Sequence, residues 1–126
     1  KADLERRCDI INSSGADMVI SIHQNSYVTP KAEGAQVFYY KKSEESKRIA
    51  QIMQGILGEK LGTTRQIKSD VNYYILLHSK LPTIISECGF LSNPEEEQRL
   101  CTEEYQEKVA DALYCGIIEY LMMNMK

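Results

Sequence analysis

The chain has 126 residues and a net charge of −3. This length suits a single domain, which can bury about two thirds of its unfolded surface, and the ordinary apolar content excludes a disordered chain. Basic residues are scattered rather than grouped, which argues against binding to nucleic acid or to an anionic membrane surface. No apolar run approaches the roughly 20 residues that a membrane-spanning helix needs.

The first half of the chain predicts a helix, two strands and a second helix. Residues 3–14 are predicted to be helical, because apolar residues recur at i, i+4 and i+7 and Gly15 can end the helix. The apolar run 17–23 predicts a buried parallel strand, and residues 35–40 predict another. Residues 43–61 carry an apolar stripe opposite a polar face, which predicts an amphipathic helix.

The second half predicts two strands and two helices. Residues 72–77 and 83–87 read as strands joined by a turn, and the acidic run 95–97 reads as the solvated first turn of a short helix. A last helix is expected after Thr102. Strands that alternate with helices predict a single α/β domain. We expect a mostly parallel, twisted sheet with helices on both faces.

Four cysteines are present, namely Cys8, Cys88, Cys101 and Cys115. None of them forms a C-x-x-C pair, which argues against a structural zinc knuckle. They are either reduced thiols packed in the core, as free cysteines usually are, or two of them pair.

Two of the predicted strands end in residues that can do chemistry, His23 and Glu87. If the strands run parallel, both side chains reach the same rim of the sheet, where open parallel sheets bind ligands. A neutral imidazole is a good zinc ligand, and a carboxylate in apolar surroundings can act as a general base and acid. From residue type alone, however, His23 could be a hydrogen-bonded rim histidine, and Glu87 could pair with a lysine.

Two stretches carry a family resemblance. "SSGADMVISIHQNS" and "LPTIISECGFLSNPEEEQRL" resemble the zinc-dependent N-acetylmuramoyl-L-alanine amidases of the amidase-3 family, in particular its spore-cortex members. The resemblance implies a hydrolase that cleaves the amide between the lactyl group of N-acetylmuramic acid and L-alanine of the peptidoglycan stem peptide. It implies Zn²⁺ as cofactor, His23 as a zinc ligand and Glu87 as the catalytic glutamate. Asn25 and Arg65 are expected to line the substrate groove.

The sequence also departs from the family pattern. The family holds zinc with two histidines and a glutamate, and its first histidine sits in an Asp-Pro-Gly-His-Gly-Gly stretch that this sequence lacks. We therefore expect residues 1–126 to be the C-terminal portion of one amidase catalytic domain. Such a portion lacks the first strands of the sheet and two of three zinc ligands. It should be inactive alone, and should pair with the missing N-terminal segment or self-associate through the exposed sheet edge.

The resemblance implies a place and a role as well. An amidase of this family works outside the cytoplasmic membrane, so a signal or anchor is expected upstream of residue 1. A spore-type enzyme would act in cortex maturation and germination, on the forespore side, and could need an accessory protein.

Two alternatives to a zinc amidase stay open from the residues themselves. The chain could be a non-catalytic module that binds the cell wall. Alternatively, Cys88 beside Glu87 could form a Cys–His hydrolase pair with His23 across the rim.

Overall fold

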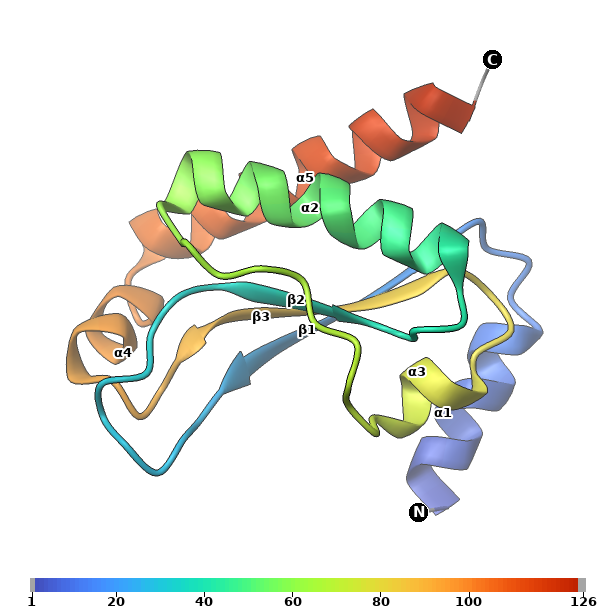
Figure 1. Cartoon of the computed structure of the whole chain (residues 1–126), viewed down its shortest axis with the longest axis horizontal. Coiled ribbons are helices and arrows are strands. Elements are labelled where there is room, and N and C mark those ends of the chain that lie inside the picture. Colours follow the sequence, from blue (N-terminus) through green and yellow to red (C-terminus); the bar gives the residue numbers. More distant parts are fainter. Residues whose placement is uncertain (1, 125–126) are drawn as a thin grey trace.

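The computed structural model describes residues 2–124, and Figure 1 shows the arrangement of their helices and strands. The elements follow in the order α1 (Ala2–Asn12), β1 (Val19–Asn25), β2 (Gln36–Tyr39), α2 (Glu44–Leu61), α3 (Tyr74–His78), β3 (Thr83–Phe90), α4 (Pro94–Leu100) and α5 (Glu103–Asn124). The predicted class, a single α/β domain, is confirmed.

The strands form one sheet in the order β1-β3-β2, with β3 buried along its whole length. β1 pairs with β3 in parallel, whereas β2 pairs with β3 antiparallel. The sheet is therefore mixed rather than mostly parallel. The outer edge of β2 is covered, because the main chain of Lys68 exchanges hydrogen bonds with Tyr39 and Val37, each 3.1 Å long. The outer edge of β1 has no strand partner within residues 2–124.

Helices cover both faces of the sheet, as predicted (Figure 1). α2 and α5 lie side by side on one face, where Met53 and Ala112 are fully buried in the main core together with Ile84 of β3. The opposite face carries a smaller cluster of Phe38, Leu76 and Ile85, to which α3 contributes. The sheet thus has a thickly covered face and a more open one.

The strand predicted over residues 72–77 is wrong, because Tyr74–His78 forms the short helix α3. A short run of aromatic and aliphatic residues cannot be assigned to strand or helix by periodicity alone. Ile75 and Leu76 are both buried in this helix, which contacts β3 and α1.

α2 begins and ends at the residues that its sequence signals predict. Ser43 accepts a hydrogen bond from the main-chain N–H of Ser46 and so caps α2, as a serine at this position commonly does. Gly62 ends the same helix at φ 79°, a left-handed conformation that favours glycine. Gly15, after α1, also has a positive φ of 72°.

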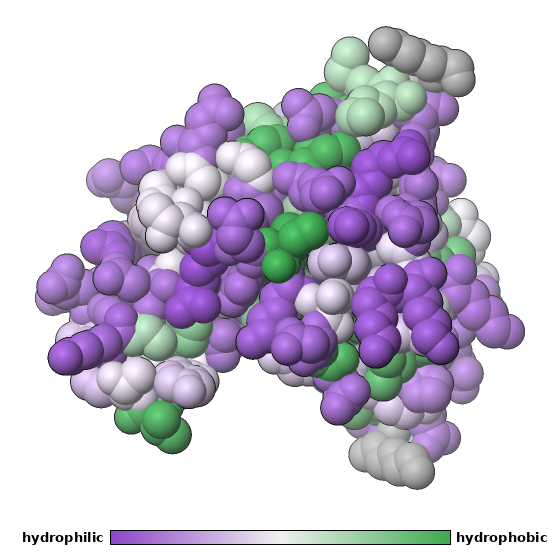
Figure 2. Space-filling view, in the orientation of Figure 1, coloured by the Kyte–Doolittle hydropathy of each residue, from purple (hydrophilic) through white to green (hydrophobic). Residues whose placement is uncertain are grey.

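Hydrophilic residues cover most of the surface seen in Figure 2, and apolar residues appear there only in small separate groups. None of the helices in residues 2–124 is long and apolar enough to cross a membrane. All four cysteines are free thiols. Cys8 and Cys88 are buried, Cys115 is half-buried and Cys101 is exposed.

Candidate active site

The parallel pairing of β1 with β3 brings His23 directly opposite Glu87. Both strands continue past these residues, to Asn25 and Phe90, with a shift of register after the His23–Glu87 pair. The two side chains therefore lie near the carboxyl ends of the strands rather than at their last residues.

Strand alternation places both side chains on the more open face of the sheet. Ile20 packs against the main core under α2 and α5, so Ser21 and His23 face the other way. The Ser21 hydroxyl is 2.8 Å from Nε2 of His23, as expected for side chains two residues apart on one face. Glu87 shares the face of Ile85, which packs in the smaller cluster.

Glu87 is a buried carboxyl group, with only 5% of the residue exposed. Its Oε2 atom is buried and has no hydrogen-bond partner in the part of the chain that the structure describes. Burial raises the pKa of Glu87 above its ordinary value, although the nearby His23 ring and the Tyr73 hydroxyl act in the opposite direction. Unpartnered buried polar atoms are uncommon, and a raised pKa suits a group that takes up and returns a proton.

A groove of about 350 Å³ lies on the same open face. Its lining residues are Asn25, Tyr27, Ala32, Gln36, Phe38, Arg65, Lys68, Val71, Tyr73 and Phe90. Gln36 is the register partner of Glu87 on β2, so the groove runs beside the carboxylate. In Figure 2 the lower outline of the molecule is indented between two lobes below the sheet.

The structure places both predicted substrate-groove residues, Asn25 and Arg65, in the lining of this groove. Sequence reasoning missed Lys68 and Tyr73. Tyr73 was assigned to a strand, whereas it stands directly before α3, with its ring edge-on to Phe38 at 5.6 Å between centroids. Lys68 carries no local signal in the sequence, because its position depends on a single bridge to β2.

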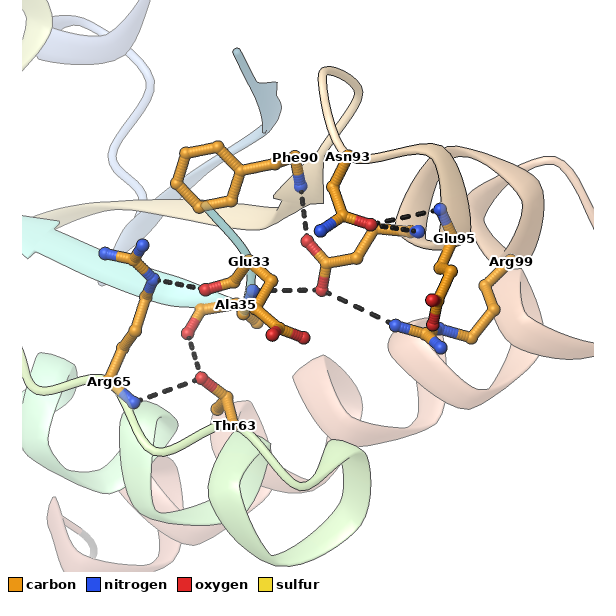
Figure 3. A network of polar contacts seen from close by, with 10 residues as sticks. Glu33, Ala35, Thr63, Arg65, Phe90, Asn93, Glu95 and Arg99 are labelled. Carbon is orange, nitrogen blue, oxygen red and sulfur yellow. Dashed lines mark hydrogen bonds and ion pairs between the residues drawn. The ribbon is translucent and has the colours of Figure 1, made fainter. Parts of the chain in front are cut away.

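Arg65 fixes one wall of the groove through contacts with three neighbouring residues. Figure 3 shows its side chain beside Glu33 and Phe90. Its Nε donates a hydrogen bond to the carbonyl oxygen of Glu33 at 2.6 Å, and its Nη1 donates to Oε1 of Gln36 at 3.1 Å. The guanidinium lies over the Phe90 ring, 4.7 Å from its centroid, in a cation–π arrangement. Arg65 therefore holds the segment before β2 against the end of β3.

Glu96 of α4 holds the same wall, because it bonds to the main chain at both Gly34 and Phe90. Its Oε1 accepts a hydrogen bond from the Phe90 N–H at 2.8 Å, and its Oε2 accepts one from the Gly34 N–H at 2.9 Å. The prediction of a solvated acidic run over residues 95–97 is wrong for Glu96, which is 6% exposed. The loop before β2 folds over this residue and buries it.

The described side chains around His23 offer too few donors to hold a catalytic zinc ion. A catalytic zinc is held by three protein ligands and keeps one open position. His23 and the buried, unpartnered Oε2 of Glu87 are candidate donors, yet residues 2–124 contain no group of three His, Cys, Asp or Glu side chains that could hold a metal ion. These residues alone do not fit a three-ligand zinc site.

Comparison with known proteins defines the class of the chain. Residues 1–119 match the model of the amidase-3 family, described as N-acetylmuramoyl-L-alanine amidase, and the chain belongs to this family. It is 41% identical over 119 residues to a germination-specific N-acetylmuramoyl-L-alanine amidase of Bacillus subtilis, a match covering 94% of this chain and 50% of the relative. The chain is also 29% identical to the amidase LytC of the same organism, with 24% of that protein covered.

Solved structures give the same picture. The CwlD amidase of Clostridioides difficile, in complex with the GerS lipoprotein, matches with a TM-score of 0.91 and 39% identity, covering 96% of this chain and 62% of that one. The catalytic domain of CwlV, an N-acetylmuramoyl-L-alanine amidase from Bacillus (Paenibacillus) polymyxa, matches at 0.86 and 31%, covering 94% and 65%. The chain thus spans half the length of the germination-specific relative and under two thirds of each of these structures. This family is generally zinc-dependent.

Proposed function

We propose that the protein containing this chain hydrolyses the amide between the lactyl group of N-acetylmuramic acid and L-alanine of the peptidoglycan stem peptide. The observation that carries the proposal is the pairing of His23 with the buried carboxyl group of Glu87, whose Oε2 has no hydrogen-bond partner among the described residues, beside a groove. Membership of the amidase-3 family supports it. Glu87 would take a proton from the attacking water and return it to the leaving amine.

The test of the catalytic role is the Glu87→Gln variant of the longest form of this protein that cleaves peptidoglycan. Glutamine keeps the shape of the side chain but cannot carry the proton, so kcat should fall by about 10²-fold or more. Mass spectrometry would count the free L-alanine amino termini released from the muropeptides. Glu95→Gln, an exposed change on α4, is the control, and turnover by Glu87→Gln at the control rate would overturn the assignment.

We infer that His23 supplies one zinc ligand and that the other ligands come from outside residues 2–124. His23 is exposed, whereas Glu87 beside it is buried, so the imidazole can reach a metal at the surface of the sheet. It follows from this proposal that residues 1–126 alone, as the C-terminal portion of a catalytic domain, retain little zinc and are inactive.

Elemental analysis of the purified 126-residue chain, with its intact mass recorded on the same sample, tests this inference. The expected result is zinc far below one ion per chain. Near-stoichiometric zinc in a sample whose mass matches these residues alone would overturn it. In a longer, zinc-loaded form, His23→Ala should lose the metal and His78→Ala should keep it.

We further propose a role in spore cortex maturation and germination, outside the cytoplasmic membrane. The support is the germination-specific relative and the resemblance to an amidase solved with a lipoprotein, which makes an accessory protein a reasonable partner. If the role is correct, spores of an endospore-forming host carrying Glu87→Gln should contain less cortex muramic lactam. Unchanged muropeptide profiles would contradict it.

The Cys–His alternative loses support from the position of Cys88. This thiol packs in the main core under α2 and α5, on the face of the sheet opposite to His23. Burial and the nearby Glu87 raise the pKa of Cys88 to about 11. A thiol that stays protonated and faces away from the imidazole is not an activated nucleophile.

A further inference from the structure

The groove beside Glu87 has an unusual charge for this protein. Its lining contains two cationic side chains, Arg65 and Lys68, and no aspartate or glutamate, although the chain as a whole carries a net charge of −3. Four aromatic rings, those of Tyr27, Phe38, Tyr73 and Phe90, line the same groove. A concave surface that combines aromatic rings with polar groups, and whose charged groups all have one sign, is suited to a specific anionic ligand.

The side chains of the two cationic residues differ in how far they can move. Arg65 is held by the Glu33 carbonyl, by Gln36 and by the Phe90 ring, so its position is fixed by the protein. Lys68 is fixed only through its main chain, whose N–H and carbonyl oxygen both form hydrogen bonds with β2. Its side chain is exposed, and none of the ion pairs found in residues 2–124 includes it. The ammonium group of Lys68 can therefore move to meet a ligand, while its main chain keeps a fixed position.

One wall of the groove is also rigid. Glu96 ties the N–H groups of Gly34 and Phe90 together, and Arg65 ties Glu33 and Gln36 to the same ring. This wall is therefore held before any ligand arrives. A preformed groove loses little conformational freedom on binding, which favours affinity for a short flexible ligand such as a peptide.

We propose that this groove binds the peptide side of the substrate and that Lys68, assisted by Arg65, contacts a carboxylate of the stem peptide. The inference rests on the proposed function, which puts the scissile amide at Glu87. The sugar side of that amide is largely neutral hydroxyl and acetamido groups, whereas an acidic stem peptide carries carboxylates beyond L-alanine. A groove that lies beside Glu87, and whose only charged lining residues are cations, selects the peptide side.

The experiment measures binding rather than cleavage, so that it stands apart from the proposed activity. The 126-residue chain is titrated with L-alanyl-D-glutamate as the free acid and as the peptide with both carboxylates amidated. Chemical shifts of the groove residues report where each probe binds, and circular dichroism confirms folding. The free acid should bind about tenfold more tightly than the amidated peptide, and its affinity should fall as salt is raised.

Two substitutions at one position and a matched control sharpen the test. Lys68→Gln should weaken binding of the free acid about tenfold, and Lys68→Glu should weaken it further, while neither changes binding of the amidated peptide. Both replace an exposed side chain and should leave the fold intact. Lys108→Gln, an exposed lysine on α5 across the sheet, should have no effect.

Several results would overturn the proposal. These are equal binding of both probes, binding of the acid that Lys68→Glu leaves unchanged, shifts that map outside the groove, and no binding to a folded chain. A longer form that fails to cleave peptidoglycan yet binds the acidic dipeptide in a Lys68-dependent way would refute the proposed activity and leave the carboxylate site standing.

Discussion

Glu96 is a buried carboxylate that joins two distant parts of the main chain, Gly34 and Phe90. Hydrogen bonds to a charged group contribute about 1.5–3 kcal/mol each, and a buried donor left unpaired costs a similar amount. In Glu96→Gln, the side-chain NH2 would face one of the two main-chain N–H groups. Two donors cannot form a hydrogen bond, so that N–H would lose its acceptor. We expect the free energy of unfolding to fall by about 2 kcal/mol, measured by urea denaturation.

The neighbouring Glu95 gives the matched control, because it lies on the same helix and is exposed. Glu95→Gln should change the unfolding free energy by less than about 0.5 kcal/mol. Equal stability of the two variants would mean that the Glu96 hydrogen bonds contribute nothing net to the fold.

The cysteines provide a second test at the scale of single residues. The pKa of Cys88 is raised to about 11, so at pH 8 only roughly one thiol in a thousand would be the reactive thiolate, and burial blocks access to it. Cys101 is exposed. Iodoacetamide at pH 8 should therefore label Cys101 and leave Cys88 unmodified, as peptide mass mapping would show. Rapid labelling of Cys88 in the folded chain would revive the Cys–His alternative.

Single residues show what the sequence could and could not predict about the site. The pairing of His23 with Glu87 could be predicted, because each follows a short apolar run that reads as a strand. Parallel strands bring their carboxyl ends to the same edge of the sheet. The burial of Glu96 does not follow, since it depends on a loop 62 positions away in the chain. A helix N-terminus followed by three glutamates looks solvated until that loop covers one of them.

At the scale of elements, the contact between α2 and α5 depends on a glycine. A Cβ added at Gly116 of α5 would come within 2.5 Å of Sδ and Cε at the end of the Met53 side chain on α2. This flexible end would have to move, and because Met53 is fully buried it would have to move within a closed core. Overpacking of this kind typically costs 1–3 kcal/mol, which exceeds the roughly 1 kcal/mol that alanine gains over glycine in a helix. Gly116→Ala should therefore lower the melting temperature.

Gly55 of α2 is the control for this prediction, because a Cβ there would meet nothing within 4 Å. Gly55→Ala should stabilise the chain by about 0.5–1 kcal/mol through helix propensity alone. Differential scanning calorimetry of both variants would separate packing from propensity. If both substitutions raised the melting temperature, the end of the Met53 side chain would move aside at little cost, and the expected overpacking would be refuted.

A helix could be predicted from the sequence when the signals that stabilise it lie within its own residues. α2 was predicted over residues 43–61 and forms Glu44–Leu61, because its cap, its apolar stripe and its terminal glycine all lie within its own sequence. α3 contains only five residues, too few to show a helical period. Packing against β3 and α1 decides its conformation, and the sequence of the segment does not show that packing.

At the scale of the whole molecule, the outstanding feature is the free edge of β1. In residues 2–124 this strand pairs only with β3, and Ile22 on it is 62% exposed. Next to Ile22, an apolar cavity of about 210 Å³ is lined by Cys88, Leu100, Val109 and Leu113. Open edges of a sheet pair readily with other strands, and exposed apolar surface beside an edge strengthens that pairing.

We therefore expect the 126-residue chain, purified without any further segment, to self-associate through β1. Size-exclusion chromatography with light scattering should show a mass above one chain that rises with concentration. Ile22→Lys puts a charge on the edge strand and should shift the chain towards the monomer. Ile10→Lys replaces a similarly exposed residue, 67% accessible, on α1 away from that strand and should not. A folded, monodisperse monomer at all concentrations would show that the β1 edge needs no partner, and the proposal that further strands complete the sheet would lose its physical basis.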